Sequence, residues 1–347
     1  MKPQTLQKTA LALLVGWYAA NAAAYSEQGQ AGNTKSWESA EYLKDWGLTS
    51  MNASTAYALG FNGSGVKIGV MDSGVLLNHP EFQDGRIHVV KTEGTYSKDG
   101  MRYPDASVGN GPINKNEPVK NGKRNFDKTD NGVFTKGEAF NIDGTWHKYT
   151  NDAHGTHVGG TMAASRDGNE MHGVAFGANL YSANTGGNDN MTYGPNQDYD
   201  FFLQGYSALA DAGAKVINNS WGSNRRVNSS FAGAQGYKPK YDWRDVPEYG
   251  VQYYDVPKAP EPISSPAAHI YLSNLGEAEK AYYQFVTSGE KNFVDAAYEV
   301  AKNKQVIQVF TAGNRSMMAE SFTRAMLPYF RPDAEKYWVN VTGQVGG

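Results

Sequence analysis

The chain has 347 residues, with 32 Lys and Arg against 35 Asp and Glu, and a formal net charge of −3. A charge so close to zero supplies no strong field for phosphate groups, which argues against nucleic acid as a partner. The sequence contains no cysteine, which excludes disulfides, thiolate zinc sites and a cysteine nucleophile. The length allows two domains, although an α/β fold with insertions can reach it as one.

Residues 1–24 are typical of a secretory signal peptide. Lys2 and Lys8 precede the apolar run 10–20, and Ala22 and Ala24 form a small-x-small cleavage site. The apolar run is too short to cross a bilayer as a helix, and no later segment is apolar enough to do so. The sequence therefore predicts export to a secreted or cell-surface location, with a polar lead-in at residues 25–45.

Strand and helix patterns alternate along the rest of the chain. We expect helices at 37–59, 154–165, 199–212 and 292–302, and strands at 66–70, 174–183, 215–218, 306–310 and 338–341. This alternation predicts an α/β fold with a mostly parallel sheet and helices on both faces. Two segments rich in turn-forming residues, about 91–149 and about 224–288, are expected to be surface insertions rather than core elements.

Three polar residues lie where such a sheet binds ligands, beyond the carboxyl ends of its strands. Asp72 ends the first strand ahead of Ser73 and Gly74, although an isolated Asp-Ser-Gly more often caps a turn. His154 opens a helix and can accept a proton near neutral pH. Asn314 follows the strand 306–310 and can donate an amide hydrogen bond to an oxyanion.

His154 and His157 are three residues apart, a spacing that could also suggest zinc. The metalloprotease helix motif instead spaces its histidines by four residues and places a Glu between them. Zinc is therefore disfavoured, no metal ligands are assigned, and His157 is expected to be a structural histidine inside the fold.

Taken together, these motifs resemble those of the subtilisin-like serine proteases. Residues 66–74 resemble the Asp motif of that family, 154–164 its His motif, and 216–222 and 311–314 two further segments. The resemblance covers about 46–347 apart from the two insertions, and it implies a protease domain there. The sequence most resembles the bacterial autotransporter branch of the family. A serotype-specific surface antigen of that branch is one candidate for the kind of protein it encodes.

The resemblance implies a role for each catalytic position. Asp72 would orient and stabilise the charged histidine, and His154 would act as general base and then as general acid. Asn314 would donate to the oxyanion. The substrate would be a protein or peptide, and no cofactor would be required for catalysis. Structural calcium is common in the family, but the Asp/Asn-rich loops identify no ligands for it.

The resemblance also implies a substrate-binding surface. Ser220, Trp221 and Gly222 would form an edge that binds the substrate backbone as an added strand. Gly313 and Arg315 would line the primary specificity pocket, where a positive charge favours an acidic or neutral side chain before the scissile bond. The alternative, which the sequence favours equally, is that the Arg315 side chain points to solvent and does not line the pocket.

The nucleophile motif of the family, Gly-Thr-Ser-x-Ala, is absent from the sequence. Family spacing puts the nucleophile about 66 residues after the oxyanion Asn, whereas 347 − 314 = 33 residues follow Asn314. We therefore expect the N-terminal portion of a larger protease, either a partial sequence or a truncated product, inactive as it stands. An autotransporter's translocating β-barrel would also lie beyond it.

The sequence leaves two other classes of function open. One is a non-catalytic surface antigen or binding module built on the same fold. The other is a metal-dependent hydrolase, which would lose activity to chelators and resist serine-directed fluorophosphonates.

Overall fold

The computed structural model describes residues 29–101, 133–146, 153–185, 199–221, 242–246, 251–256, 291, 293–311 and 327–341. The predicted signal peptide lies outside these residues. The chain divides into two compact units, each formed by separate stretches of sequence. Unit 1 comprises Met1–Val66, Asn78–Ile87 and Gly159–Asn179, and unit 2 comprises Lys67–Leu77, His88–Val158 and Leu180–Gly347. The predicted limits of the lead-in and of the protease domain stay predictions.

Short helices make up the first part of unit 1, where the sequence pattern predicted one helix over 37–59. They are η1 (Thr34–Trp37), α2 (Ala40–Lys44), α3 (Trp46–Ser50) and α4 (Ala53–Ala58), followed later by η2 (Pro80–Phe82). The helix is interrupted because polar side chains cap new starts. Ser39 accepts from the Tyr42 amide and Asp45 from the Gly47 amide. Behind the caps lies a small core of buried side chains, namely Tyr42, Leu48, Ala53 and Tyr57.

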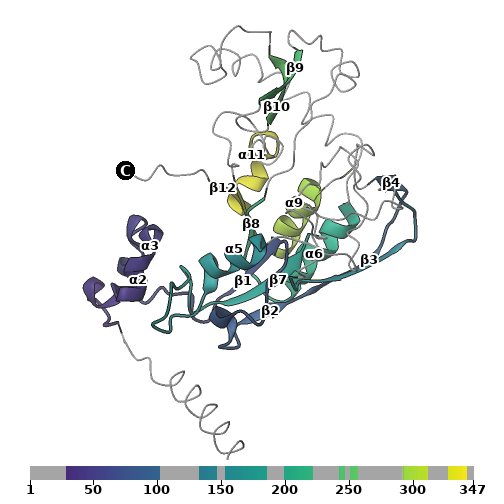
Figure 1. Cartoon of the computed structure of the whole chain (residues 1–347). Coiled ribbons are helices and arrows are strands. Elements are labelled where there is room, and N and C mark those ends of the chain that lie inside the picture. Colours follow the sequence, from purple (N-terminus) through teal and green to yellow (C-terminus); the bar gives the residue numbers. More distant parts are fainter. Residues whose placement is uncertain are drawn as a thin grey trace, which may run out of the picture. The chain divides into compact units, whose positions relative to one another are not determined.

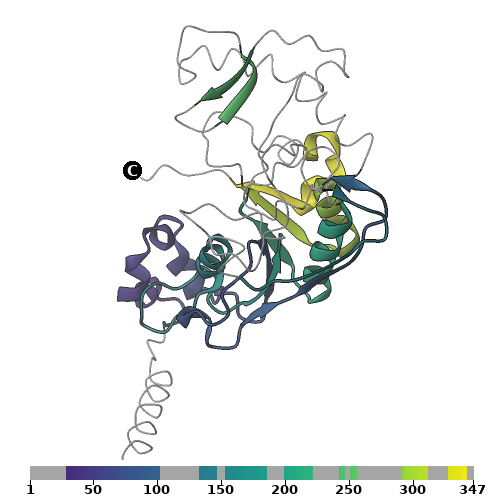
Figure 2. The same ribbon diagram turned by 45° about the vertical axis from the view of Figure 1, so that its right-hand side comes forward.

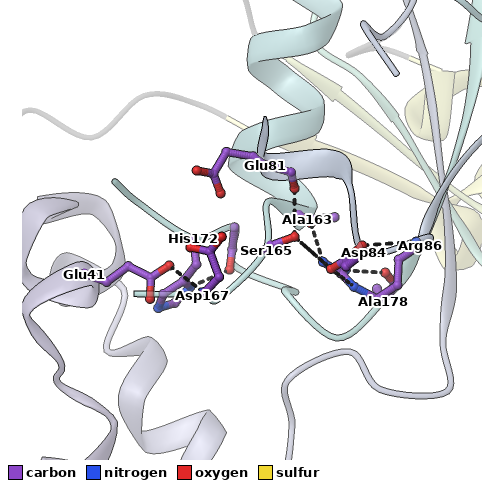
Figure 3. A network of polar contacts seen from close by, with 10 residues as sticks. Glu41, Glu81, Asp84, Arg86, Ala163, Ser165, Asp167, His172 and Ala178 are labelled. Atoms are coloured by element: carbon purple, nitrogen blue, oxygen red, sulfur yellow. Dashed lines mark hydrogen bonds and ion pairs between the residues drawn. The ribbon is translucent and has the colours of Figure 1, made fainter. Parts of the chain in front are cut away.

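A polar network fixes the backbone of unit 1 that follows α5 (His154–Ala163) (Figure 3). The Arg86 guanidinium donates to the carbonyl oxygens of Ala163 and Ala178. The Ser165 hydroxyl is 2.8 Å from the Glu81 carbonyl oxygen. These bonds satisfy backbone groups that no strand or helix pairs.

Unit 2 is built on a mostly parallel sheet, which confirms the predicted fold class (Figure 1). Its strand order is β12-β11-β8-β1-β7-β2. The strands are β1 (Lys67–Asp72), β2 (Ile87–Val89), β7 (Asn179–Asn184), β8 (Val216–Asn219), β11 (Ile307–Thr311) and β12 (Trp338–Val341). The pairs β1–β8, β8–β11 and β11–β12 are parallel. The strand predicted at 174–183 is shorter than expected, because residues 174–177 form a turn.

Helices α6 (Tyr199–Asp211) and α9 (Phe293–Lys304) lie side by side in both views (Figure 1 and Figure 2). A Cβ atom on Gly205 of α6 would lie 2.9 Å from the Met71 side chain, so α6 packs closely on the face of β1 that carries Met71. Successive side chains of a strand point to opposite faces. Asp72 therefore points to the face opposite α6, where it meets the first residue of α5.

The ends of the first predicted insertion belong to the core, so the expectation of a surface insertion over 91–149 was wrong there. β3 (Lys91–Thr95) and β6 (Ala139–Asp143) form an antiparallel pair. Tyr96 and Phe140 are buried in the main hydrophobic cluster of unit 2. Their ring centroids are 5.0 Å apart. The hydrophobic contacts of these two rings therefore anchor the segment on the sheet.

The remaining described elements are β4 (Gly100–Met101), β5 (Val133–Phe134), β9 (Asp242–Val246), β10 (Val251–Val256), α11 (Leu327–Phe330) and η4 (Pro332–Tyr337). β9 and β10 pair antiparallel and are the described part of the second predicted insertion. Within the described ranges, no helix has the length and apolar content needed to span a bilayer.

Candidate active site

The side chains of Asp72 and His154 meet, although 82 residues separate them in the sequence. His154 Nδ1 is 2.8 Å from Asp72 Oδ1. The Asp72 side chain is 2% exposed and that of His154 is 43% exposed. An ionised Asp72 accepts a hydrogen bond from Nδ1–H, the tautomer that leaves Nε2 as the proton acceptor. A buried carboxylate that is hydrogen-bonded to a half-exposed imidazole can hold the ring in one orientation, and an imidazole can exchange a proton near neutral pH.

Local backbone contacts fix the Asp72 side of this pair. The Ser73 amide donates to Asp72 Oδ1 at 2.7 Å. The Ser73 hydroxyl accepts from the Gly155 amide at 2.8 Å. Gly155 belongs to the first turn of α5, whose amides have no partner within the helix. Ser73 therefore caps the helix that begins with His154 while its own amide orients the carboxylate.

Asn184 is a site residue that the sequence reasoning missed. It lies at the end of β7 and is 4% exposed. Its Nδ2 donates to the carbonyl oxygens of Ser73 at 3.3 Å and Thr145 at 3.2 Å. The amide thus ties the turn after Asp72 to the segment that follows β6. A polar residue closing a predicted buried strand was the available signal, but it does not reveal which carbonyls the side chain reaches.

Ser220 and Trp221 follow β8, the parallel neighbour of β1, so they lie at the same sheet edge as Asp72. Ser220 Oγ accepts from Asn218 Nδ2 at 2.8 Å. The Trp221 indole donates to the Met71 carbonyl oxygen at 2.6 Å. The Trp221 side chain is thus bound within unit 2, and the substrate-binding role predicted for the backbone here stays a prediction.

The other predicted site residues, Gly222, Gly313, Asn314 and Arg315, lie outside the described residues. Their roles in substrate binding and at the oxyanion therefore stay predictions.

His157 is exposed on α5, so the expectation of a histidine inside the fold was wrong. Within the part of the chain that the structure describes, no three His, Asp or Glu side chains are grouped so as to hold a metal ion.

The sequence is similar to known proteins over most of its length. The pattern of the subtilase family (peptidase S8) matches residues 63–344. An extracellular serine protease of Serratia marcescens is 29% identical over 343 residues, which cover 96% of this chain and 26% of the relative. Bacillopeptidase F of Bacillus subtilis is 29% identical over 276 residues, covering 74% of this chain and 16% of the relative. The chain thus spans about a quarter or less of the length of these curated relatives.

Two solved structures are also similar. Fervidolysin from Fervidobacterium pennivorans has 19% identity and a TM-score of 0.32, over 78% of this chain and 24% of that one. The MycP3 protease of a type VII secretion system has 16% identity and a TM-score of 0.33, over 78% and 47% of the two chains. The family match covers most of the chain, including both members of the Asp72–His154 pair. The chain therefore belongs to the subtilase family.

Proposed function

We propose that this chain supplies the acid and base of a secreted serine endopeptidase. The observation that carries the proposal is the 2.8 Å contact between His154 Nδ1 and the buried Asp72 carboxylate. Membership of the subtilase family and similarity to extracellular serine proteases support the same reaction.

In the proposed reaction His154 Nε2 removes the proton of a serine hydroxyl, and the serine oxygen attacks the peptide carbonyl carbon. His154 then returns the proton to the leaving amine. Asp72 holds the imidazole in the required tautomer and stabilises the imidazolium that forms. We propose that the serine lies in a Gly-Thr-Ser-x-Ala motif of the full-length protein, since the 347 residues contain none.

The substrate side of the proposal uses the residues that follow β8 and β11. Ser220, Trp221 and Gly222 would pair with the substrate backbone, and Asn314 would donate to the oxyanion. Arg315 would disfavour a basic side chain before the scissile bond. Cleavage of a peptide library by the full-length enzyme tests this preference, and efficient cleavage after Lys or Arg would contradict it.

The proposal places the protein outside the cell. The predicted signal peptide and the two extracellular relatives from Serratia support this location. Attachment to the outer membrane as an autotransporter is a narrower form of the proposal. Fractionation of the producing cells distinguishes release into the medium from retention at the surface.

Peptidase assays and fluorophosphonate labelling of the full-length protein test the proposed reaction. We expect His154→Ala to lower kcat by about 10⁶-fold and Asp72→Asn by about 10⁴-fold. His157→Ala is the matched control, because it removes an exposed imidazole from the same helix. It should retain wild-type kcat.

Three results would contradict the proposal. Equal activity of His154→Ala and His157→Ala would exclude His154 as the general base. Activity that resists fluorophosphonate and disappears with a chelator would indicate a metal-dependent hydrolase. A full-length protein with neither labelling nor peptidase activity would leave a non-catalytic surface antigen or binding module.

A further inference from the structure

We propose that Trp221 is a positioning residue, whose indole fixes the substrate-binding edge after β8 relative to the strand that carries Asp72. This inference rests on the proposed function and concerns how the same site holds an extended peptide. It goes beyond the Asp72–His154 pair, because Trp221 would act on substrate alignment and not on proton transfer.

Within the described residues, the backbone pairing of β1 with β8 ends before Asp72. The parallel register of β1 and β8 runs from Ile68–Val216 to Val70–Asn218. Beyond it, Trp221 Nε1–H donates to the Met71 carbonyl oxygen at 2.6 Å. Met71 immediately precedes Asp72. One side-chain hydrogen bond therefore continues the connection between the strands at the level of the catalytic carboxylate.

The indole that makes this bond is itself held by two helices. Its ring centroid is 5.6 Å from that of Phe202 on α6 and 5.4 Å from that of Phe293 on α9. Both phenylalanines are buried in the main cluster of unit 2. Rings packed in this way restrict the rotamer of Trp221. The direction of the N–H group is thus set by packing in the core of unit 2.

The end of β1 is fixed from its other side as well. The Asp72 carbonyl oxygen accepts from the Thr185 amide at 2.7 Å. Since that bond comes from the chain after β7, loss of the indole bond would leave Asp72 anchored. The backbone at Ser220 and Trp221 would lose a tie to β1. We therefore expect the substrate edge, and not the acid–base pair, to shift.

Such a shift matters most for substrates that use the edge. A displacement of about 1 Å in a positioning group can cost about 10²-fold in rate, because reacting atoms leave their near-attack geometry. A long peptide binds along the edge before it reacts. A small fluorophosphonate needs only the nucleophile and the acid–base pair. The two reagents therefore separate substrate alignment from the chemistry itself.

The test uses the full-length protein with Trp221→Phe, which keeps an aromatic ring between Phe202 and Phe293 but removes the donor. Trp338→Phe is the matched control, since Trp338 is buried in the same core and packs on Phe310 at 4.7 Å. We measure kcat and KM for peptides with one and with four residues before the scissile bond, the rate of fluorophosphonate inactivation, and the melting temperature.

For Trp221→Phe we expect kcat/KM for the long peptide to fall about tenfold, the effect of one lost hydrogen bond. The short peptide and the inactivation rate should change less than about threefold. Trp338→Phe should lower the melting temperature and leave the ratio of long to short peptide unchanged. If Trp221→Phe does not fold, benzothienylalanine at position 221 keeps the bicyclic shape and lacks the N–H donor.

An unchanged long-to-short ratio in the donor-free variant overturns the inference, as does an equal fall in all three rates. Asp72→Asn serves as the separate check on the proposed function. If Asp72→Asn keeps wild-type activity, the proposed function fails, whatever the peptide ratio of Trp221→Phe. If Asp72→Asn loses activity while the ratio is unaffected by Trp221→Phe, only the positioning role fails.

Discussion

Gly155 lies directly against Gly74: a Cβ atom on Gly155 would come 2.5 Å from the Gly74 carbonyl oxygen. Real Cβ atoms do not approach backbone that closely. The same approach allows the Gly155 amide to donate to the Ser73 hydroxyl. Since His154 precedes Gly155, the missing side chain at Gly155 is what allows the imidazole to reach Asp72.

Replacing Gly155 by Ala should therefore destabilise the protein by about 1–3 kcal/mol, as overpacking against rigid backbone does. Gly160→Ala in the same helix is the control, because a Cβ there meets nothing within 4 Å. Ala exceeds Gly in helix propensity, so this control should gain up to about 1 kcal/mol. Urea unfolding measures both changes. Equal stability of the two variants would falsify the prediction that a side chain at position 155 clashes with the Gly74 backbone.

A second prediction concerns a buried polar network that joins α6, β8 and β11. The Tyr206 hydroxyl donates to Asn219 Oδ1 at 2.9 Å, and Asn219 Nδ2 donates to Gln308 Oε1 at 3.0 Å. All three residues are fully buried. Tyr206→Phe removes the donor to Asn219 Oδ1, and we expect a loss of about 1–3 kcal/mol in unfolding free energy.

Tyr298→Phe is the control for Tyr206→Phe. The Tyr298 hydroxyl donates to Asp333 in an exposed pair, where water can replace it. Its removal should change stability by less than about 0.5 kcal/mol. An equal loss of unfolding free energy in both variants would show that the buried hydrogen bond stabilises the protein no more than the exposed one.

Five of the six strands of the main sheet, the helices α5, α6 and α9, and the Asp72–His154 pair could be predicted from the sequence, because short stretches of sequence carry their patterns. Alternating apolar residues predict β1, and helical spacing predicts α6 and α9. Parallel strands bring their carboxyl ends to one edge. The motif resemblance then pointed to Asp72 and His154 specifically, and the 2.8 Å contact confirms that they meet.

Other features depend on contacts between distant residues and could not be predicted in this way. Tyr96 and Phe140 enter the core from a segment rich in turn-forming residues, so composition hid them. The sequence does not show that Asn184 reaches the carbonyl of Ser73, because a side-chain amide leaves no periodic pattern. The exposure of His157 follows from where α5 packs, which its small residues do not specify.

Glu81 predicts a pH dependence for unit 1. Glu81 is 9% exposed, and its Oε2 has no hydrogen-bond partner within the described residues. Burial, and then the negative charges of Asp167, Glu41, Glu170 and Asp84, raise the pKa of Glu81 from 4.5 to about 7. The folded state therefore binds the proton more tightly than the unfolded state. The stability due to this proton is complete below pH 4.5 and is lost as the pH rises through 7.

We expect the unfolding free energy contributed by Glu81 to fall by about 1–2 kcal/mol over this interval, less than full linkage gives because solvent screens the cluster. Glu81→Gln should flatten that part of the profile, since the amide is neutral throughout. Glu335→Gln makes the same change in charge at an exposed position of η4 and should leave the slope intact. Urea unfolding at pH 5, 6, 7 and 8 measures the slopes; a wild-type slope in Glu81→Gln would exclude this carboxyl as its source.

His172 predicts the opposite slope in the same unit. The imidazole is 2% exposed and packs against Tyr42, Tyr57 and Phe176, while Nδ1–H donates to the Gly173 carbonyl oxygen at 2.9 Å. Burial lowers the pKa of His172 below 6.5, against the opposing effect of the Gly173 hydrogen bond. The unfolded chain thus takes up the proton first, and stability is lost as the pH falls from 6.5 through the lower folded-state value.

Because the slopes of Glu81 and His172 oppose each other over an overlapping range, the His172 effect is measured in the Glu81→Gln background. There we expect unfolding free energy to decrease steadily below pH 6.5. Adding His172→Gln keeps an N–H donor available for the Gly173 carbonyl but removes the titrating group, so the decrease should disappear. Adding His157→Gln instead removes an exposed histidine and should leave it in place. If the decrease persists with His172→Gln, the buried imidazole is not the group that the acid protonates.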